Sequence, residues 1–452
     1  MASYPADLAV LIQDRLKREK VPAPSADVLT KFLEVIYFVS LKTEESEYVR
    51  CWVTFADPRK PDADPPARAR ADRWSIAKLE NRIPFNTRNL VKFAPAADPW
   101  STAVAVYYDK GALFIWGLVD QAVHTSTALV RESSSRYPPP GIFYAIAQGT
   151  ADLSVYREDG LIARLRQDTI VTREHNVLWR GPIYRMLLPS IRKLRAYVVG
   201  EVGRETYDAS QFSPGGLEEE WLGTLSRLLI GIQRYRHGGA LLLSNTVSDL
   251  HFKYPLHYDR LCDCLRRRAV FQVRASAAMH EIHDRYIEYD KKRLPMGLYY
   301  EEGIARGEEE DCDAELTGCV RFISSLSRVD GLIHCDSDLR INGFGAEILV
   351  GDDPKRVFQS SASKPSAKDL LPLDPSHFGM RHRSMMRFCA RHVGSVGFVI
   401  SQDGDIRAMV SDARKLYVWE NVMVLHLWKE YMSRMSRRFE KKYGKSFGAK
   451  RG

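Results

Sequence analysis

The sequence has no long apolar run, and this absence narrows the class of protein. No stretch of the 452 residues reaches the roughly 18 consecutive apolar residues that a membrane-spanning helix needs. Residues 1–7 show neither the charged region nor the apolar region of a signal peptide, so we expect none. There is also no low-complexity tract. We therefore expect a globular protein without a membrane span, located in the cytoplasm.

Cysteine is scarce, and its spacing is not that of a metal site. The chain has seven cysteines, an odd number in a long chain, which favours reduced thiols. Cys262 and Cys264 are close in sequence, as are Cys312 and Cys319, but neither pair has the spacing of a zinc site. We interpret all four as ordinary residues.

Positive charge is concentrated at the C-terminal end. The formal net charge of the chain is +9, and residues 429–452 carry nine Lys or Arg against two Glu, a net of +7. A tail of this kind can contact nucleic acid or anionic lipid. A solvated helix end is the alternative that its position favours.

Residues 1–212 have the pattern of an α+β domain. Two paired apolar runs, 103–108 and 112–118, flank Asp109-Lys110-Gly111 and predict a hairpin. No cluster of catalytic side chains occurs in this half, so we interpret it as a sensing or scaffolding domain. The other predicted elements are helices over 7–20 and from Ser25 to Leu41, and strands over 48–55, 142–147, 152–156 and 161–165.

The second half alternates helices and strands, a pattern typical of an α/β domain. Turn-forming residues at 211–216 mark the boundary, and residues 217–415 form the predicted α/β domain. Helical patterns within 256–310 suggest an insertion. We expect residues 416–452 to form an amphipathic helix, about 419–439, followed by the basic tail.

Four short motifs carry the functional interpretation. Asp330 follows a helical run and opens an apolar one, so a carboxylate lies at the start of a strand. Arg381-His382-Arg383 begins a helix, where guanidinium groups beside free backbone N–H groups suit phosphates. The other two motifs are Gly239-Ala240-Leu241, which opens a buried strand, and Ser401-Gln402-Asp403, which closes one.

This order of motifs resembles that of the diadenylate cyclase domain, which joins two ATP molecules into cyclic di-AMP. That family has a Gly-Ala-Leu strand, an Asp-Gly-Ala motif, a Gly-Thr-Arg-His-Arg motif and a Ser-Glu-Glu strand end. The resemblance covers residues 217–412. The whole chain is similar to the group whose N-terminal half is called DACNV, a sensor fused to this domain. The matching segments here are Gly239–Leu241, Asp330–Leu332, Gly379–Arg383 and Ser401–Asp403.

The resemblance implies a role for each matching residue. Asp330 would hold Mg²⁺ or Mn²⁺, and Arg381, His382 and Arg383 would hold the phosphates. Ser401 would donate a hydrogen bond near them, while Gly239 and Gly331 would let the backbone approach the nucleotide. The symmetric product implies a homodimer with two nucleotide domains face to face. The remaining residues expected to bind the nucleotide are Ala240, Leu241, Leu332, Gly379, Met380 and Ser384.

Departures from the family pattern leave two functions open. Leu332 replaces the smaller Ala, Met380 replaces Thr, and Gln402 replaces the first Glu and cannot carry charge to a metal. Asp403, one residue later, is the alternative metal-binding carboxylate. The chain is then either a working cyclase regulated by its N-terminal half, or a weakened enzyme that binds ATP or a cyclic dinucleotide as a sensor. The intact Asp330 favours the enzyme.

Overall fold

The computed structural model divides into two compact units, Met1–Glu174 and His175–Gly452. Within the described ranges, no helix has both the length and the apolar character that crossing a bilayer requires. The structure describes residues 2–45, 47–59, 74–98, 101–121, 141–157, 160–172, 176–210, 214–235, 237–288, 296–402, 405–412, 414–422 and 424.

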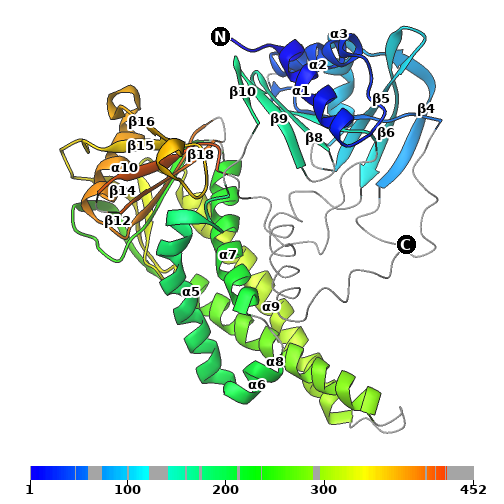
Figure 1. The fold of residues 1–452 in the computed structure, drawn as a ribbon. Helices are drawn as coiled ribbons and strands as arrows, with labels where there is room; N and C mark the ends of the chain where they lie inside the picture. Colours follow the sequence, from blue (N-terminus) through cyan, green and yellow to red (C-terminus); the bar gives the residue numbers. More distant parts are fainter. Residues whose placement is uncertain are drawn as a thin grey trace. The chain divides into compact units, whose positions relative to one another are not determined.

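The first unit is an eight-stranded sheet with helices on one face (Figure 1). The strand order is β10-β9-β8-β7-β3-β5-β6-β4, and only β3 and β5 are parallel neighbours. The helices are α1 (Pro5–Arg18), α2 (Ala26–Ser40) and α3 (Thr87–Phe93). The strands are β3 (Cys51–Phe55), β4 (Trp74–Pro84), β5 (Thr102–Asp109), β6 (Ala112–Gln121), β7 (Tyr144–Gly149), β8 (Asp152–Arg157), β9 (Gly160–Arg166) and β10 (Thr169–Val171), with β1 (Thr43–Glu44) and β2 (Glu47–Tyr48) as a separate pair.

Helix α2 joins the helical layer to the sheet. It begins at Ser25, whose hydroxyl accepts a hydrogen bond from the backbone N–H of Val28. Its apolar face buries Phe32, whose ring centroid lies 5.5 Å from that of Phe55 and 5.6 Å from that of Phe143. The predicted hairpin is present as β5 and β6, so the α+β reading of this half is confirmed.

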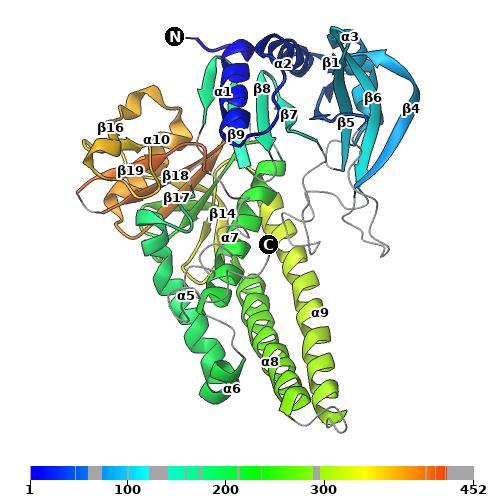
Figure 2. The same ribbon diagram turned by 45° about the vertical axis from the view of Figure 1, so that its right-hand side comes forward.

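The second unit is a nine-stranded mixed sheet between two helical layers (Figures 1 and 2). The strand order is β12-β14-β13-β11-β17-β18-β19-β15-β16, and the parallel neighbours are β11 with β13 and β15 with β19. The helices are α5 (Gly181–Val202), α6 (Arg204–Ala209), α7 (Pro214–Arg234), α8 (Arg260–Glu288), α9 (Met296–Leu326) and α10 (Met380–Arg391). The strands are β11 (Gly239–Leu243), β12 (Leu250–Tyr258), β13 (Leu332–Cys335), β14 (Ile341–Ile348), β15 (Val357–Ser360), β16 (Leu370–Pro372), β17 (Val396–Ile400), β18 (Ile406–Ser411) and β19 (Leu416–Trp419).

Three boundaries differ from the sequence predictions. The division at Glu174 lies before the expected boundary at 212, because α5 and α6 pack against α7 and α8 of the second unit. The insertion predicted at 256–310 consists mainly of α8 and α9, which lie side by side (Figure 2), but it also includes the end of β12. Residues 416–419 are a sheet strand and not the start of a helix, and residues 420–422 and 424 are not helical either. The remainder of the predicted helix and the basic tail lie outside the described residues.

Candidate nucleotide site

The four motifs meet at one edge of the nine-stranded sheet. Strands β11 and β13 are parallel neighbours, so Gly239 and Leu332 start at the same edge. Strand β17 runs antiparallel to β11 and pairs Ile400 with Gly239, which brings its end to that edge. The first turn of α10 also contacts this edge through Arg381. The topology therefore gathers segments as far apart in the sequence as Gly239 and Ser401.

Asp330 and Arg381 lie together at this edge. Oδ1 of Asp330 is 3.8 Å from Nη2 of Arg381. The Asp330 side chain is 99% exposed and that of Arg381 is 37% exposed. An ion pair this exposed contributes little to stability, so a ligand can replace either partner at little cost. The carboxylate and the guanidinium can therefore act on one bound molecule.

Gly238 leaves room for the guanidinium of Arg381. Its φ of +67° lies in the left-handed region that favours glycine. A methyl group at this position would lie 2.8 Å from Nη1 of Arg381 and 3.2 Å from the carbonyl oxygen of Ile400. The guanidinium thus lies directly over the backbone at the start of β11.

Gly331 permits a close approach between two strands. Its φ is +118°, and a methyl group there would lie 2.5 Å from the carbonyl carbon of Gly345. Gly345, with a φ of +60°, would place its own methyl group 3.4 Å from the carbonyl oxygen of Asp330. These two glycines let β13 and β14 approach closely beside Asp330, so Gly331 has a structural reason that needs no ligand.

His382 lies inward from the exposed pair. Its Nε2 is 2.9 Å from Nη1 of Arg407, which donates this hydrogen bond. Burial, together with the charges of Arg407 and Arg381, lowers the pKa of His382 to about 4. The imidazole is therefore neutral at pH 7. The sequence pattern predicted His382 as a phosphate ligand, and a neutral imidazole brings no positive charge to a phosphate. Arg407 continues the network through Glu420, whose Oε1 accepts from its Nε at 2.9 Å.

Arg383 points into an ion pair of its own. Its Nη2 is 2.6 Å from Oδ2 of Asp353, while Oδ1 of the same carboxylate is 2.6 Å from Nε of Arg387. The two guanidinium groups lower the pKa of Asp353 through these hydrogen bonds. The expected set of three phosphate ligands, Arg381 to Arg383, is therefore reduced to Arg381 in this arrangement.

Several predicted nucleotide-binding residues have packing roles. Gly239 is buried, and a methyl group there would lie 2.7 Å from Cγ2 of Ile232, so packing accounts for this glycine. Ala240 and Leu332 belong to the apolar core beneath α10, and Leu241 is fully buried. Leu332, the larger residue in place of the family's Ala, thus fills the core.

Ser401 stabilises the turn between β17 and β18. Its hydroxyl accepts a hydrogen bond from the backbone N–H of Asp405 at 3.1 Å, and its own N–H donates to the Asp405 carbonyl at 2.9 Å. These hydrogen bonds indicate that Ser401 stabilises the turn, and they give no indication of the predicted contact with phosphate. Asp403, the alternative metal ligand, lies outside the described residues.

The start of α10 remains open to a ligand. Gly379 is its N-cap and offers no side-chain cap to the first backbone N–H groups. Met380 is 82% exposed, and Ser384 is half-buried one turn later. Free N–H groups at a helix start attract anions, and Arg381 adds a full charge to them.

The carboxylate at this edge suits an ion such as Mg²⁺ only when a bound molecule supplies further metal ligands. Among the residues that the structure describes, no three His, Cys, Asp or Glu side chains are grouped to hold a metal. Mg²⁺ commonly uses one or two carboxylates and completes its shell with substrate phosphates and water. The exposed carboxylate of Asp330 fits that mode, so a metal would bind here with the nucleotide and not before it.

Gly238 and Arg407 had no predicted role at this site. Gly238 stands next to the motif glycine, and the doublet Gly238-Gly239 was its only signal. Arg407 lies on β18 opposite Val399, a relation that depends on strand register. No local pattern around Arg407 indicates its contact with His382.

Comparison with known proteins identifies one part of the chain. Residues 18–120 match the family model described as "Probable sensor domain DACNV", a domain associated with diadenylate cyclases. This confirms the sensor-type reading of that stretch and does not extend to the residues at the sheet edge. No curated protein matches the chain.

Proposed function

We propose that the chain is a diadenylate cyclase, which condenses two ATP into cyclic di-AMP and releases two pyrophosphates. The observation that carries this proposal is the approach of Asp330 to Arg381, 3.8 Å apart, at an edge where two strands start and a third ends. Association of the sensor domain at residues 18–120 with such enzymes supports it.

The reaction needs positioning more than covalent help from the protein. The 3′-oxygen of one ATP bonds to the α-phosphorus of the other, the bond to pyrophosphate breaks, and the same exchange follows in the other direction. Arg381 and the N–H groups at the start of α10 would hold the triphosphate in line for this displacement. Neutral His382 would keep α10 in place through Arg407.

A divalent cation would be held by Asp330 and the phosphates. When bound, Mg²⁺ or Mn²⁺ supplies charge that offsets the negative charge developing on the phosphate oxygens. The exposed carboxylate of Asp330 would provide a protein ligand, so affinity for the metal should depend on nucleotide. A symmetric product further implies that two copies of the chain face each other, each with one ATP.

A second function remains a candidate because the residues that match the family motifs offer fewer available charges than the family pattern implies. His382 is neutral, Arg383 is paired with Asp353, and Gln402 replaces an acid. A site of this kind suits a receptor for ATP or a cyclic dinucleotide without turnover. The basic tail lies outside the described residues, and a contact between it and nucleic acid stays a prediction.

The decisive experiment incubates the full-length chain with ATP and Mn²⁺ or Mg²⁺ and identifies the products by mass. We expect cyclic di-AMP and pyrophosphate. Asp330→Asn should reduce the rate by at least about 100-fold, because removing a charge that acts in the transition state costs about 2.7 kcal/mol or more. Its stability should not change, since the side chain is 99% exposed.

Asp352→Asn is the matched control, because Asp352 is also an exposed carboxylate of the second unit. This variant should keep the wild-type rate. Tight binding of ATP with no product under either metal would reject the enzyme in favour of the receptor.

A further inference from the structure

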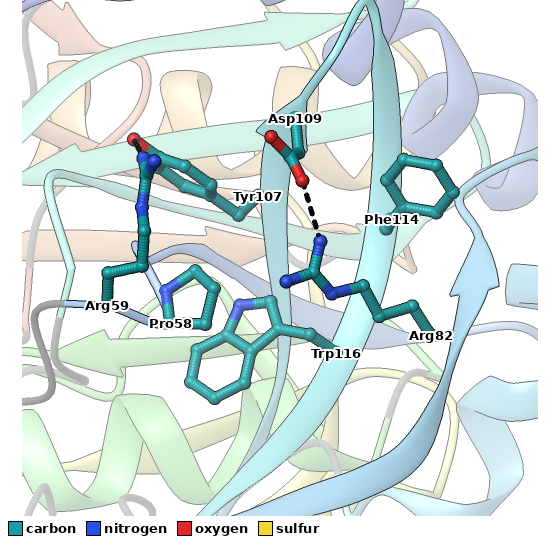
Figure 3. A pocket seen from close by; sticks show the side chains of 7 residues that line it. All are labelled: Pro58, Arg59, Arg82, Tyr107, Asp109, Phe114 and Trp116. Atoms are coloured by element: carbon teal, nitrogen blue, oxygen red, sulfur yellow. Dashed lines mark hydrogen bonds and ion pairs between the residues drawn. The ribbon is translucent and has the colours of Figure 1, made fainter.

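A cavity in the first unit is too small to hold a ligand (Figure 3). It lies among the loop after β3 and strands β4, β5 and β6, and its volume is about 30 Å³, room for one or two water molecules. The guanidinium of Arg59 covers the Tyr107 ring, 5.4 Å from its centroid, and Nη1 of Arg82 is 2.8 Å from Oδ2 of Asp109. These side chains satisfy one another, so the cavity needs no ligand.

An exposed aromatic pair lies on the second unit near Asp330. Tyr254 is on β12, the edge strand of the nine-stranded sheet, and Phe344 is opposite it on β14 (Figure 1). Their ring centroids are 4.9 Å apart and the ring planes are inclined by 19°, so the two rings are stacked. Tyr254 is nevertheless 50% exposed. The ring face that Phe344 does not cover is therefore available to another planar group.

The aromatic pair lies on the face of the sheet that α10 covers. Phe252, two residues before Tyr254, packs against the apolar core beneath α10. Ala346, two residues after Phe344, belongs to that core. Side chains two residues apart on a strand point to the same face, so both rings are on the side of the sheet where α10 carries Arg381.

Tyr254 also lies beside the backbone of Asp330. A methyl group on Gly345 would be 3.2 Å from Cδ2 of Tyr254 and 3.4 Å from the carbonyl oxygen of Asp330, so the ring and the Asp-Gly motif flank the same point. The pKa of Lys253 is raised by its hydrogen bond to Glu347 and also by the charge of Asp330. The edge strand and the carboxylate of the candidate site are thus close neighbours.

The width of the sheet between Arg381 and Tyr254 suits one nucleotide. Arg381 lies over the start of β11, and β13 and β14 separate β11 from β12. Three strand spacings amount to about 14 Å. A nucleotide that places its phosphates on Arg381 and extends past Asp330 therefore brings its base to Tyr254, whereas a phosphate alone does not reach the ring.

We propose that Tyr254, supported by Phe344, is the surface on which the purine base of the bound nucleotide stacks. The triphosphate would lie on Arg381 and the start of α10, the ribose would pass Asp330, and the base would cover the available face of Tyr254. Every base can stack on an aromatic ring, and preferences follow stacking strength, which favours the larger ring system of a purine. The inference rests on the proposed nucleotide site and holds for a cyclase and for a receptor alike.

The test is calorimetric titration of the full-length chain with two probes in the presence of Mg²⁺. α,β-Methylene-ATP carries the base and cannot release pyrophosphate, and inorganic tripolyphosphate carries phosphates alone. Tyr254→Ala should weaken binding of the ATP analogue about tenfold, because base stacking is lost. The same variant should bind tripolyphosphate as the wild type does, which also shows that the edge of the sheet remains folded.

Two further variants serve as controls. Tyr254→Phe keeps the ring and should bind both probes as the wild type does. Tyr300→Ala removes a tyrosine that is 73% exposed on α9, and it should also leave both affinities unchanged.

The preference for a purine has a test of its own. The wild type should bind α,β-methylene-ATP more tightly than α,β-methylene-CTP, and Tyr254→Ala should lose this preference. Equal affinity of the wild type for the two analogues would overturn the assignment of a purine.

The outcomes separate this inference from the proposed function. If Tyr254→Ala leaves affinity for the ATP analogue unchanged, the stacking surface is overturned and the cyclase stands. Equal losses for the analogue and for tripolyphosphate would also overturn it, because the side chain would then act on the phosphates or on the fold. A wild type that binds the analogue through Tyr254 but makes no product from ATP would reject the cyclase and keep the stacking surface.

Discussion

Two adjacent glycines at the start of β11 are required for different reasons. Gly239 leaves room for Ile232, which packs beneath the strand. Gly238 has a left-handed backbone and leaves room for the guanidinium of Arg381. Of the two, only Gly238 lies beside a residue of the candidate site, Arg381.

Gly238→Ala should therefore impair the site more than it destabilises the fold. The new methyl group would lie 2.8 Å from Nη1 of Arg381, so the guanidinium must shift from its present position 3.8 Å from Asp330. We expect ATP affinity to fall about tenfold or more, which corresponds to the loss of one charge-assisted hydrogen bond of about 1.5–3 kcal/mol. Equilibrium titration with ATP measures this effect.

Gly394→Ala is the control for backbone strain alone. Gly394 also has a positive φ, +96°, but a methyl group there meets no atom within 4 Å. Both variants should lose about 1–2 kcal/mol of stability from the left-handed conformation, and only Gly238→Ala should lose ATP. Equal losses of affinity in the two would contradict the role of Gly238.

His382 should make the second unit sensitive to acid. Its pKa is about 4 in the folded chain, against an ordinary value of 6.5, so between these values the unfolded chain binds the extra proton. Stability is then full above about pH 6.5 and falls as the pH drops towards 4, by up to about 3 kcal/mol. Urea unfolding of wild type and His382→Gln between pH 7.5 and 4.5 measures the difference.

The variant should show a flatter dependence on pH than the wild type. His377→Gln serves as its control, because the His377 side chain is 80% exposed. If His382→Gln lost stability in acid as steeply as the wild type, the buried imidazole would not be the cause.

Residue types and their order predict which groups meet, but not how each is oriented. The Asp-Gly and Arg-His-Arg motifs indicate a carboxylate near cations, and the structure brings Asp330 and Arg381 together. The neutral state of His382 depends on Arg407, which reaches it across strand register. The pairing of Arg383 depends on Asp353 in a loop thirty residues away. Such contacts are set by the tertiary fold and leave no local signal.

The long helices α8 and α9 are attached to α7 through buried charge. Arg268 on α8 is 8% exposed and donates to Glu220 on α7 and, from Nη2, to Glu309 on α9 at 3.4 Å. Asp313 on α9 accepts from Arg227 of α7 at 3.3 Å. Apolar spacing predicts helices in this region, but it does not predict which helix pairs with which.

Glu220→Gln should loosen this bundle. The substitution leaves the buried guanidinium of Arg268 without its closest opposite charge, and we expect a loss of about 3 kcal/mol, at the lower end for a broken buried pair. Hydrogen–deuterium exchange of peptides from α7 and α8 reports the change locally. Exchange in both helices should become faster.

Glu315→Gln is the matched control within the same bundle. Glu315 accepts from Arg260 and Arg267, whose side chains are 64% and 51% exposed. Solvent screens this network, so the loss should stay below about 1 kcal/mol. Similar exchange rates in the two variants would mean that burial of the Arg268 network has no stabilising effect.

At the scale of the whole molecule, the proposed reaction requires two copies of the chain. Each copy offers the exposed carboxylate of Asp330 at the sheet edge, and the product needs two phosphodiester bonds made in opposite directions. An isologous pair supplies two such sites with the same geometry. Both subunits must then be competent for one product to form.

Mixing wild type with a fourfold excess of Asp330→Asn tests this requirement. If subunits exchange freely, most wild-type subunits pair with an inactive partner, so the rate of cyclic di-AMP formation per wild-type subunit should fall about fivefold. The same excess of Asp352→Asn should not reduce it, because Asp352 is not among the residues proposed to hold the nucleotide or the metal. A rate per wild-type subunit that stays constant at every ratio would show that each chain works alone, and the face-to-face pair would have to be abandoned.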